Sequence, residues 1–486
     1  MIAALVLALS LAATDTPAKP VDEAATTAIV ALDQIALRSA PRDAAESRDT
    51  LALGDALEIR GRSKDYFKVY DHRRERGGYV RASQVRVVTL APEHAPELLA
   101  VALFLRDLPG YESLGIAYVA AYLAAAPGNA IGADAFDALG TMAERLARRA
   151  STNTNKARAS AIAAQLDAVA AYGVTIRSFE RDERVQLCYD GEAFRRVLAL
   201  RADADAKARA ALALTREDCI DPSLSPTERA ALDGWRADVI ARVPGAELPA
   251  HLRDRLRLRA AGVWASIAFE RARRGVDAAD AGERALAELA AVDRRDLVDG
   301  DVSAYDEAAV RVGASRWAAI PARPVPATGL AIMTSARAPG ETCVALVERK
   351  RDATKTLAER CTFGIVWASS ASTNAGNTAL ALAVQPLDGW RELWLFHREG
   401  SEWRIDTAPP GVDGSLGYVE FAGWVPGGKK VLAAREVRSG DRFVKQFEVV
   451  DIATLAVDKH ADAPASLSTF YRWQDAAWKR DTVALR

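Results

Sequence analysis

The sequence predicts a multidomain protein of α and β structure: a small all-β barrel at residues 28–90, an α-helical bundle at residues 92–295 and an all-β domain at residues 310–486. Three observations predict this order. Short alternating apolar and polar runs, separated by glycine-containing turns, are typical of a small barrel. Apolar residues then recur at helical spacing in a stretch rich in Ala, Leu, Arg and Glu. Strand-like runs return in the last third, and at 486 residues the chain is too long for one core.

The predicted barrel contains five or six short strands between about Ile35 and Val88. Gly54 and the pair Gly77-Gly78 are expected to form turns between them. This order of pieces resembles the bacterial SH3-like domain family, and the resemblance covers little more than a tenth of the chain. The matching pieces are Leu37-Arg38-Ser39-Ala40-Pro41, the spaced set Leu51, Gly54, Leu57 and Ile59, then Phe67-Lys68-Val69, and Gly78-Tyr79-Val80-Arg81 through Val85.

The resemblance implies a binding fold, with peptidoglycan peptides or another envelope protein as the ligand, and it implies no reaction. Aromatic faces stack on planar peptide or sugar groups, and arginine binds carboxylates bidentately. Phe67 and at least one tyrosine are expected in the core. A solvated, charged loop is the alternative interpretation of the arginines near His72. The predicted ligand-binding residues are Tyr66, Tyr70, Tyr79, Arg73, Arg74 and Arg81.

Residues 1–18 are predicted to be a signal peptide. Ile2–Leu11 is an almost unbroken apolar run, too short to span a membrane, and small residues at its end offer a cleavage site. No Lys or Arg precedes the run, so an ordinary amphipathic N-terminal helix is the alternative. No later segment is long and apolar enough for a span, and we expect no transmembrane segment in the mature chain. The expected location is the bacterial periplasm or the exterior.

The four cysteines are predicted to form disulfides, in agreement with export. None belongs to a C-x-x-C pair, which argues against zinc and thioredoxin-like chemistry. Of the three possible pairings, Cys188–Cys219 and Cys343–Cys361 are favoured, because each pair falls within one predicted domain. Four buried thiols are the alternative.

The helical middle is expected to hold seven or eight helices, in a bundle or a stack of helical hairpins without a strict repeat. Ser225-Pro226-Thr227-Glu228 is a predicted helix start, with a capping residue followed by proline in the first turn. Between Val174 and Gly191 a small hairpin is expected to interrupt the helices.

In the C-terminal third, tryptophans recur at Trp317, Trp367, Trp424 and Trp473, at intervals of 50, 57 and 49 residues. A tryptophan followed by several strands in each unit is typical of a propeller blade. The piece Gly423–Leu432 also resembles a turn of periplasmic β-propeller repeats. Three full units do not close a ring, so we expect a propeller-like open array or sheets packed on the helices. Coincidental spacing in a β-sandwich is the alternative.

No catalytic constellation is found in the sequence, so we expect no enzyme activity, no metal and no cofactor. The five histidines are far apart, and Asp299-Gly300-Asp301 starts like a calcium loop that lacks its glycine and glutamate. The net charge of −1 gives no attraction to nucleic acid.

The predicted function is therefore that of an exported, non-enzymatic envelope protein, which binds cell-wall peptides or a protein partner through the SH3-like module. One alternative is a structural interaction protein whose barrel has no ligand site. The other is a cell-wall-associated hydrolase with an unrecognised catalytic site.

Overall fold

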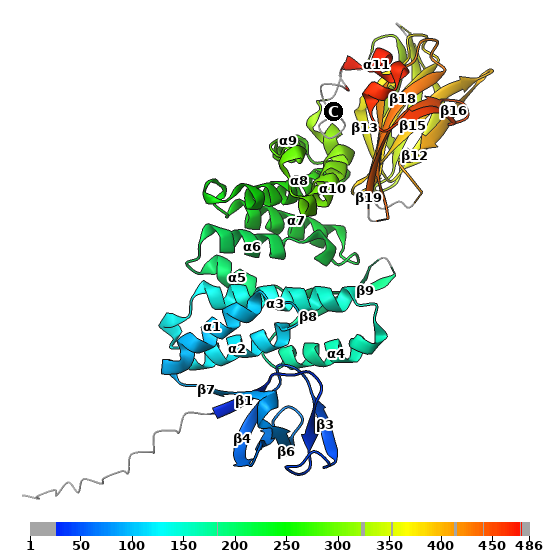
Figure 1. The fold of residues 1–486 in the computed structure, drawn as a ribbon. Coiled ribbons are helices and arrows are strands. Elements are labelled where there is room, and N and C mark those ends of the chain that lie inside the picture. The colour runs from blue at the N-terminus through cyan, green and yellow to red at the C-terminus, as the bar shows by residue number, and fades with distance from the viewer. Residues whose placement is uncertain are drawn as a thin grey trace, which may run out of the picture. The chain divides into compact units, whose positions relative to one another are not determined.

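The computed structural model describes residues 26–181, 183–321, 326–350, 353–412, 416–440, 442–476 and 478. The predicted signal peptide, residues 1–18, lies outside the described residues. The described chain combines helices and sheets and divides into two compact units (Figure 1). One unit contains the described residues up to Phe179 together with Glu183–Arg196, and the other contains Glu180, Arg181 and the residues from Val197 onward. The described helices include none with the length and apolar character needed to cross a membrane.

A seven-stranded antiparallel sheet begins the first unit, with strand order β3-β2-β6-β5-β4-β1-β7. Leu37, Val69 and Val80 belong to its buried core. Gly77 and Gly78 lie inside β6 and not in a turn as expected. Close packing explains the glycine at position 78, because an added Cβ would lie 2.7 Å from Leu37 Cγ. The strands are β1 (Thr26–Val30), β2 (Ile35–Arg38), β3 (Ser47–Leu51), β4 (Ala56–Ser63), β5 (Tyr66–Asp71), β6 (Arg76–Arg81) and β7 (Val85–Thr89).

Helices follow this N-terminal sheet, and their core is built around α2, which is buried on nearly every side. The hairpin expected between Val174 and Gly191 is confirmed as the paired strands β8 and β9. These elements are α1 (Ala95–Arg106), α2 (Glu112–Ala125), α3 (Ala133–Thr152), α4 (Lys156–Ala170), β8 (Ile176–Arg181), β9 (Arg184–Tyr189) and α5 (Glu192–Ala199).

Gly54 joins the sheet to the helices of the first unit. Its φ of +89° favours glycine, and an added Cβ would lie 2.5 Å from the Ser113 carbonyl oxygen. The Tyr172 hydroxyl donates to the Gly54 carbonyl at 2.6 Å, and Gln165 Nε2 donates to Asp33 Oδ2 at 2.9 Å. The sheet and the helices α1–α4 therefore pack as one unit.

The second unit begins with helices packed through α8, which contacts α6, α7, α9 and α10. The predicted start of α7 is confirmed as a capping box, in which Ser225 Oγ accepts from the Glu228 amide at 3.3 Å. The stretch from Asp299, which resembles the start of a calcium loop in the sequence, is the first turn of α10. These helices are α6 (Ala204–Leu214), α7 (Pro226–Ala241), α8 (Ala250–Arg273), α9 (Ala279–Ala290) and α10 (Asp299–Ser315).

Two sheets follow, and they share a core of Leu, Val, Ile, Trp and Phe side chains. One has the order β10-β11-β12, and the other has the order β13-β14-β15-β17-β18-β19-β20 with β16 beside β15. The strands are β10 (Gly329–Ala336), β11 (Thr342–Lys350), β12 (Ala353–Thr362), β13 (Ile365–Thr373), β14 (Ala379–Leu387), β15 (Trp390–Glu399), β16 (Glu402–Ala408), β17 (Gly417–Trp424), β18 (Lys430–Ser439), β19 (Arg442–Asp451) and β20 (Val457–Ala461), followed by α11 (Ser468–Trp473).

The predicted propeller-like arrangement is wrong for the described strands. Separate blades would each form their own sheet, whereas β15 pairs in parallel with β17 and joins the expected second and third units in one sheet. The spaced tryptophans also occupy unlike elements: Trp317 is in a 3₁₀ turn, Trp367 in β13, Trp424 ends β17 and Trp473 ends α11. Their spacing therefore does not mark a structural repeat.

Candidate functional site

Strand register gathers aromatic and basic side chains on one face of the N-terminal sheet. Tyr66 pairs with Arg81, Lys68 with Tyr79, and Tyr70 with Gly77. Alternate residues of a strand share a face, so these side chains lie opposite the buried Val69 and Val80. We call this surface, made of Arg60, Tyr66, Lys68, Tyr70, Tyr79 and Arg81, the aromatic–basic face.

One edge of the aromatic–basic face is organised around Tyr70. The Arg60 guanidinium lies 3.8 Å from the Tyr70 ring centroid, and the His72 ring meets its edge at 5.0 Å. Glu58 holds both side chains, because Arg60 Nη2 and His72 Nε2 lie 2.9 and 2.8 Å from its Oε2. The hydrogen bonds from Arg60 lower the pKa of Glu58. Tyr70 is thus a half-buried ring fixed by the neighbouring Arg60 and His72 side chains.

The centre of the face is formed by Lys68 and Tyr79. Lys68 is exposed and Tyr79 is half-buried. Among the described residues, neither the Lys68 ammonium nor the Tyr79 hydroxyl has a hydrogen-bond or ion-pair partner. A planar ring beside a free ammonium can stack on one group of a ligand and attract an anionic group next to it.

The other edge of the face is covered by the loop between β2 and β3. Tyr66 is 5% exposed, and its hydroxyl donates to Asp43 Oδ1 at 2.5 Å. Arg81 Nε donates to the same oxygen at 2.8 Å, and Arg81 Nη2 donates to Asp43 Oδ2. The hydrogen bonds from Arg81 and then from Tyr66 lower the pKa of Asp43.

Arg73 and Arg74 are placed apart from the predicted tyrosines, in the turn between β5 and β6, and both are engaged within the sheet. Arg73 Nη2 donates to Asp55 Oδ1 at 2.7 Å, while Arg74 Nη1 donates to Asp55 Oδ2 at 2.9 Å and to Asp71 Oδ2 at 2.6 Å. Asp55 and Asp71 are 4% and 2% exposed. Burial raises the pKa of Asp55, against the pull of the two arginines. These arginines serve as counterions of buried carboxylates.

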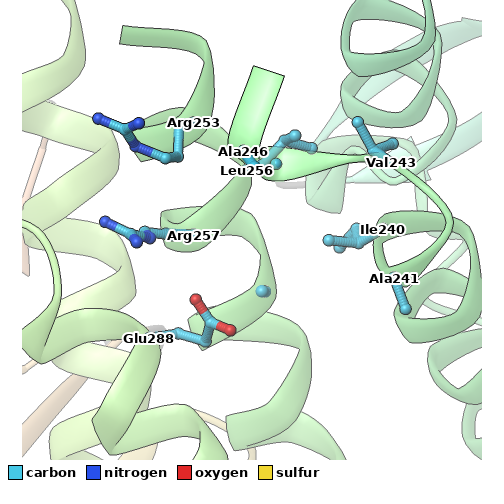
Figure 2. A pocket seen from close by; sticks show the side chains of 10 residues that line it. Ile240, Ala241, Val243, Ala246, Arg253, Leu256, Arg257 and Glu288 are labelled. Atoms are coloured by element: carbon cyan, nitrogen blue, oxygen red, sulfur yellow. The ribbon is translucent and has the colours of Figure 1, made fainter. Parts of the chain in front are cut away.

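A pocket of about 620 Å³ lies in the second unit, among α7, α8 and α9. Its two sides differ in chemistry, with charged side chains facing an apolar wall from α7 (Figure 2). Arg257 Nη1 donates to the Ala291 carbonyl at 3.1 Å, while the Arg253 guanidinium has no such partner among the described residues. The pocket suits a small molecule with an apolar body and one anionic group. Its lining is Ile240, Ala241, Val243, Gly245, Ala246, Arg253, Leu256, Arg257, Ala260 and Glu288.

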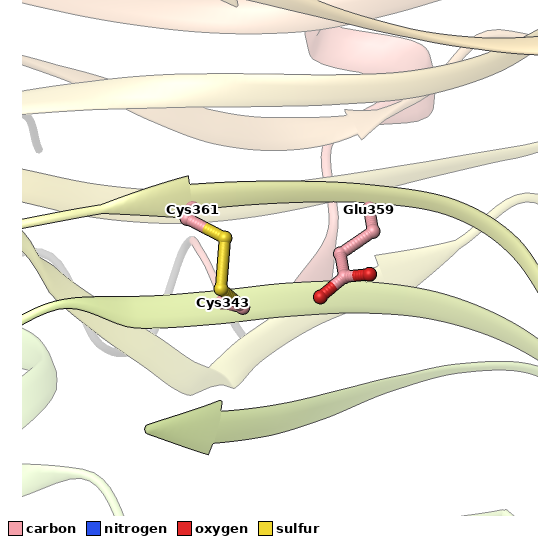
Figure 3. Close-up of side chains that lie close together, drawn as sticks. All are labelled: Cys343, Glu359 and Cys361. Atoms are coloured by element: carbon pink, nitrogen blue, oxygen red, sulfur yellow. A yellow bond between two sulfur atoms is a disulfide. The ribbon is translucent and has the colours of Figure 1, made fainter. Parts of the chain in front are cut away.

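The predicted Cys343–Cys361 disulfide is confirmed, and it joins directly paired residues of β11 and β12 (Figure 3). Cys188 and Cys219 are also disulfide-bonded, so the alternative of four thiols is wrong. Glu359 places a carboxylate oxygen within 4.8 Å of both sulfurs of the Cys343–Cys361 pair. Sulfurs joined in a disulfide are not thiolate ligands, so this cluster is a crosslink beside a surface carboxylate.

Buried ion pairs that sequence reasoning missed tie the helices to the sheets of the second unit. Glu420 is 1% exposed and accepts from Arg316 Nε and Nη2, both at 2.8 Å, and from Arg391 Nη2. Burial opposes the charge of Glu420, yet Arg316 and Arg391 outweigh it and lower the pKa of this carboxyl. Burial lowers the pKa of Arg391, which is itself fully buried. The cluster carries no nucleophile and has a structural role.

A second buried cluster surrounds Glu217. Its carboxylate lies 2.8 Å from Arg236 Nη2, 3.0 Å from Arg229 Nη2 and 3.6 Å from Arg311 Nη2. Burial opposes the charge, but the arginines, led by Arg311, hold the pKa of Glu217 well below its usual range. Arg229 and Arg311 also approach Asp388, in the turn between β14 and β15, at 3.5 and 3.8 Å. No periodic pattern marks these residues, because they come from four separated elements.

His397 and Asp406 form the pair that most resembles part of a catalytic triad, with Nε2 and Oδ2 2.6 Å apart. His397 is 2% exposed and lies within β15, so a substrate cannot approach its ring. Among the described residues, no serine or cysteine donates to its second ring nitrogen. This pair links neighbouring strands β15 and β16.

Comparison with known proteins finds no match: neither a family model, nor a curated protein, nor a solved structure is similar to this chain. The geometry described above is therefore the basis of the functional proposal.

Proposed function

We propose that this protein is an exported, non-enzymatic binding protein of the bacterial envelope, and that its aromatic–basic face binds cell-wall peptides. One observation carries the proposal: the strand register brings Lys68 and Tyr79 side by side on a solvent-facing sheet surface, where neither has an internal polar partner among the described residues. A ring and a cation that have no polar partner within the protein are available to a ligand.

The chemistry of the face suits peptides that carry carboxylates. A tyrosine ring supplies a flat apolar surface with a polar hydroxyl at its tip, and lysine and arginine attract carboxylates. Two such rings, Tyr70 and Tyr79, lie on the neighbouring strands β5 and β6, and Lys68, unpaired among the described residues, adds positive charge opposite Tyr79. The two disulfides support an oxidising compartment, where cell-wall peptides are found.

The competing proposal is a structural protein whose N-terminal sheet has no ligand site. The ion pairs of Arg73 and Arg74 with buried carboxylates favour this structural proposal for the turn between β5 and β6, since these arginines stabilise the sheet itself. The structural proposal does not explain why Lys68 and Tyr79 lie at the surface without polar partners among the described residues. The two proposals therefore differ in what they expect from variants at the centre of the face.

A pull-down of the mature chain on purified peptidoglycan tests the proposal. We expect Tyr79→Ala and Lys68→Ala each to weaken binding about fivefold, because stacking and ion pairing each contribute on the order of 1 kcal/mol. Tyr471→Ala and Lys355→Ala are matched controls, since both side chains are exposed in the second unit. Equal retention of all four variants, or no retention of the wild type, would contradict the proposal.

A further inference from the structure

Three donors of the aromatic–basic face converge on one carboxylate that belongs to the protein itself. The Tyr66 hydroxyl and Arg81 Nε donate to Asp43 Oδ1 at 2.5 and 2.8 Å, and Arg81 Nη2 donates to Asp43 Oδ2. The Arg81 guanidinium also lies 5.4 Å from the Tyr66 ring centroid. One guanidinium that donates two hydrogen bonds, together with a hydroxyl that donates a third, supplies donors to both oxygens of a carboxylate.

The loop that carries Asp43 does not depend on this carboxylate alone. The loop is tied by its backbone, because Arg38 Nη1 donates to the carbonyls of Asp43 and Ala45 at 2.5 and 3.1 Å, and the Ser39 amide donates to the Glu46 carbonyl at 2.9 Å. The side chains of Asp43 and Arg81 are 59% and 40% exposed. A ligand can therefore reach the guanidinium once the Asp43 side chain rotates away.

We infer that Arg81 and Tyr66 form a carboxylate-binding subsite, which Asp43 occupies when no ligand is bound. This inference rests on the proposed function and names the ligand group that the aromatic–basic face recognises: a free carboxylate of a cell-wall peptide. The ligand carboxylate replaces that of Asp43 on the same donors, while the rest of the peptide lies over Lys68 and Tyr79. No covalent bond is made or broken in this exchange, in which hydrogen bonds to Asp43 are replaced by hydrogen bonds to the ligand.

The expected size of the effect follows from the exposure of the ion pair. An exposed ion pair such as Asp43–Arg81 favours the paired state over the separated state about fivefold at most. Because a ligand binds only when Asp43 has left Arg81, the apparent affinity falls in proportion to the fraction of molecules in the separated state. Removal of the Asp43 carboxylate should therefore tighten the binding of a carboxylate ligand up to about fivefold. Removal of the Arg81 guanidinium should abolish the carboxylate-dependent part of binding.

The test titrates the full mature chain with N-acetyl-D-alanyl-D-alanine and with its C-terminal amide. We expect Asp43→Ala to tighten binding of the acid about fivefold, and the amide to bind more weakly than the acid. Glu46→Ala is the matched control, because it removes an exposed carboxylate from the same loop and should change nothing. The double variant Asp43→Ala/Arg81→Ala should bind no better than Arg81→Ala, and the melting temperature of each variant reports its folding.

Equal binding of acid and amide, or an unchanged affinity in Asp43→Ala, overturns the inference. The same variants on peptidoglycan separate this failure from that of the proposed function. Retention that depends on Tyr79 but is unaffected by Asp43→Ala leaves the proposed function standing and rejects the subsite. Tighter binding of the acid by Asp43→Ala without any retention on peptidoglycan supports the subsite and rejects the cell wall as the ligand.

Discussion

Replacement of Glu420 by glutamine tests the role of the buried ion cluster that joins the 3₁₀ turn after α10 to the second sheet. Glu420 is 1% exposed, and its two partners, Arg316 and Arg391, are 5% and 0% exposed. Glutamine keeps the side-chain volume but removes the negative charge. Its amide NH₂ group replaces one carboxylate oxygen, so that a donor faces an arginine donor and one hydrogen bond is lost. Loss of one partner from a buried pair costs about 3–5 kcal/mol, since the remaining charge stays desolvated. We expect the free energy of unfolding of the second unit to fall by about 4 kcal/mol.

Urea unfolding followed by tryptophan fluorescence measures this loss. Trp390 and Trp394 are buried in β15, beside Arg391, and report on the same sheet. With a urea m-value of about 2.5 kcal/mol/M, a loss of about 4 kcal/mol lowers the midpoint by about 1.5 M. The control is Glu399→Gln, because Glu399 pairs with Arg404 on the surface, where the side chains are 56% and 62% exposed. That change should cost under about 0.5 kcal/mol.

The pH dependence gives the same prediction a second test. The arginines lower the folded-state pKa of Glu420 below its ordinary value of 4.5, so its stabilising effect is complete above the unfolded pKa and is lost as the pH falls through the folded pKa. The difference in stability between wild type and Glu420→Gln should therefore be constant near pH 7 and shrink in acid below about pH 4. A cost under about 1 kcal/mol at pH 7, or a difference that grows in acid, would refute the reasoning.

Three further predictions concern stability. The double variant Cys343→Ser/Cys361→Ser should lose about 3 kcal/mol, as the chain-entropy model expects for a loop of 18 residues, and an unchanged denaturation midpoint would contradict this. Tyr172→Phe removes the donor to the Gly54 carbonyl at 2.6 Å and should cost the first unit about 1 kcal/mol in thermal unfolding; a gain in stability would argue against that bond. Asp55→Asn removes the carboxylate that Arg73 and Arg74 share, while Arg74 keeps its contact with Asp71, and should cost about 2 kcal/mol; a melting temperature equal to that of the wild type in calorimetry would contradict this.

Some neighbours of the predicted site residues could be inferred from the sequence, and others could not. Tyr66, Tyr70, Tyr79 and Arg81 come together because strand alternation, visible in the sequence, determines which side chains share a sheet face. Arg73 lies in the same short stretch, but its partner Asp55 comes from the start of another strand pair. The ion pair between Arg73 and Asp55 depends on how the strands of the sheet are arranged in space, which the spacing of the two residues in the sequence does not indicate.

The C-terminal third shows the same limit on a larger scale. Apolar, strand-like runs correctly predicted strands there, since a run of buried residues is a local pattern. The regular spacing of tryptophans suggested separate blades, yet the parallel pairing of β15 with β17 merges the strands into one sheet. Pairing between strands is decided by backbone hydrogen bonds and a shared core across long separations, which equal spacing along the chain does not encode.

The sequence by itself determined the order of β, α and β segments, the helix start at Ser225, the hairpin before α5 and the crosslink between Cys343 and Cys361. Each of these depends on neighbours within a few residues or on a single cross-strand pair. Only the tertiary structure decided that Asp43 covers Arg81 and that Glu420 lies between two arginines. Charged groups find partners through space and not along the chain, because a buried or half-buried charge is stable only where the complete fold brings its counterion to it.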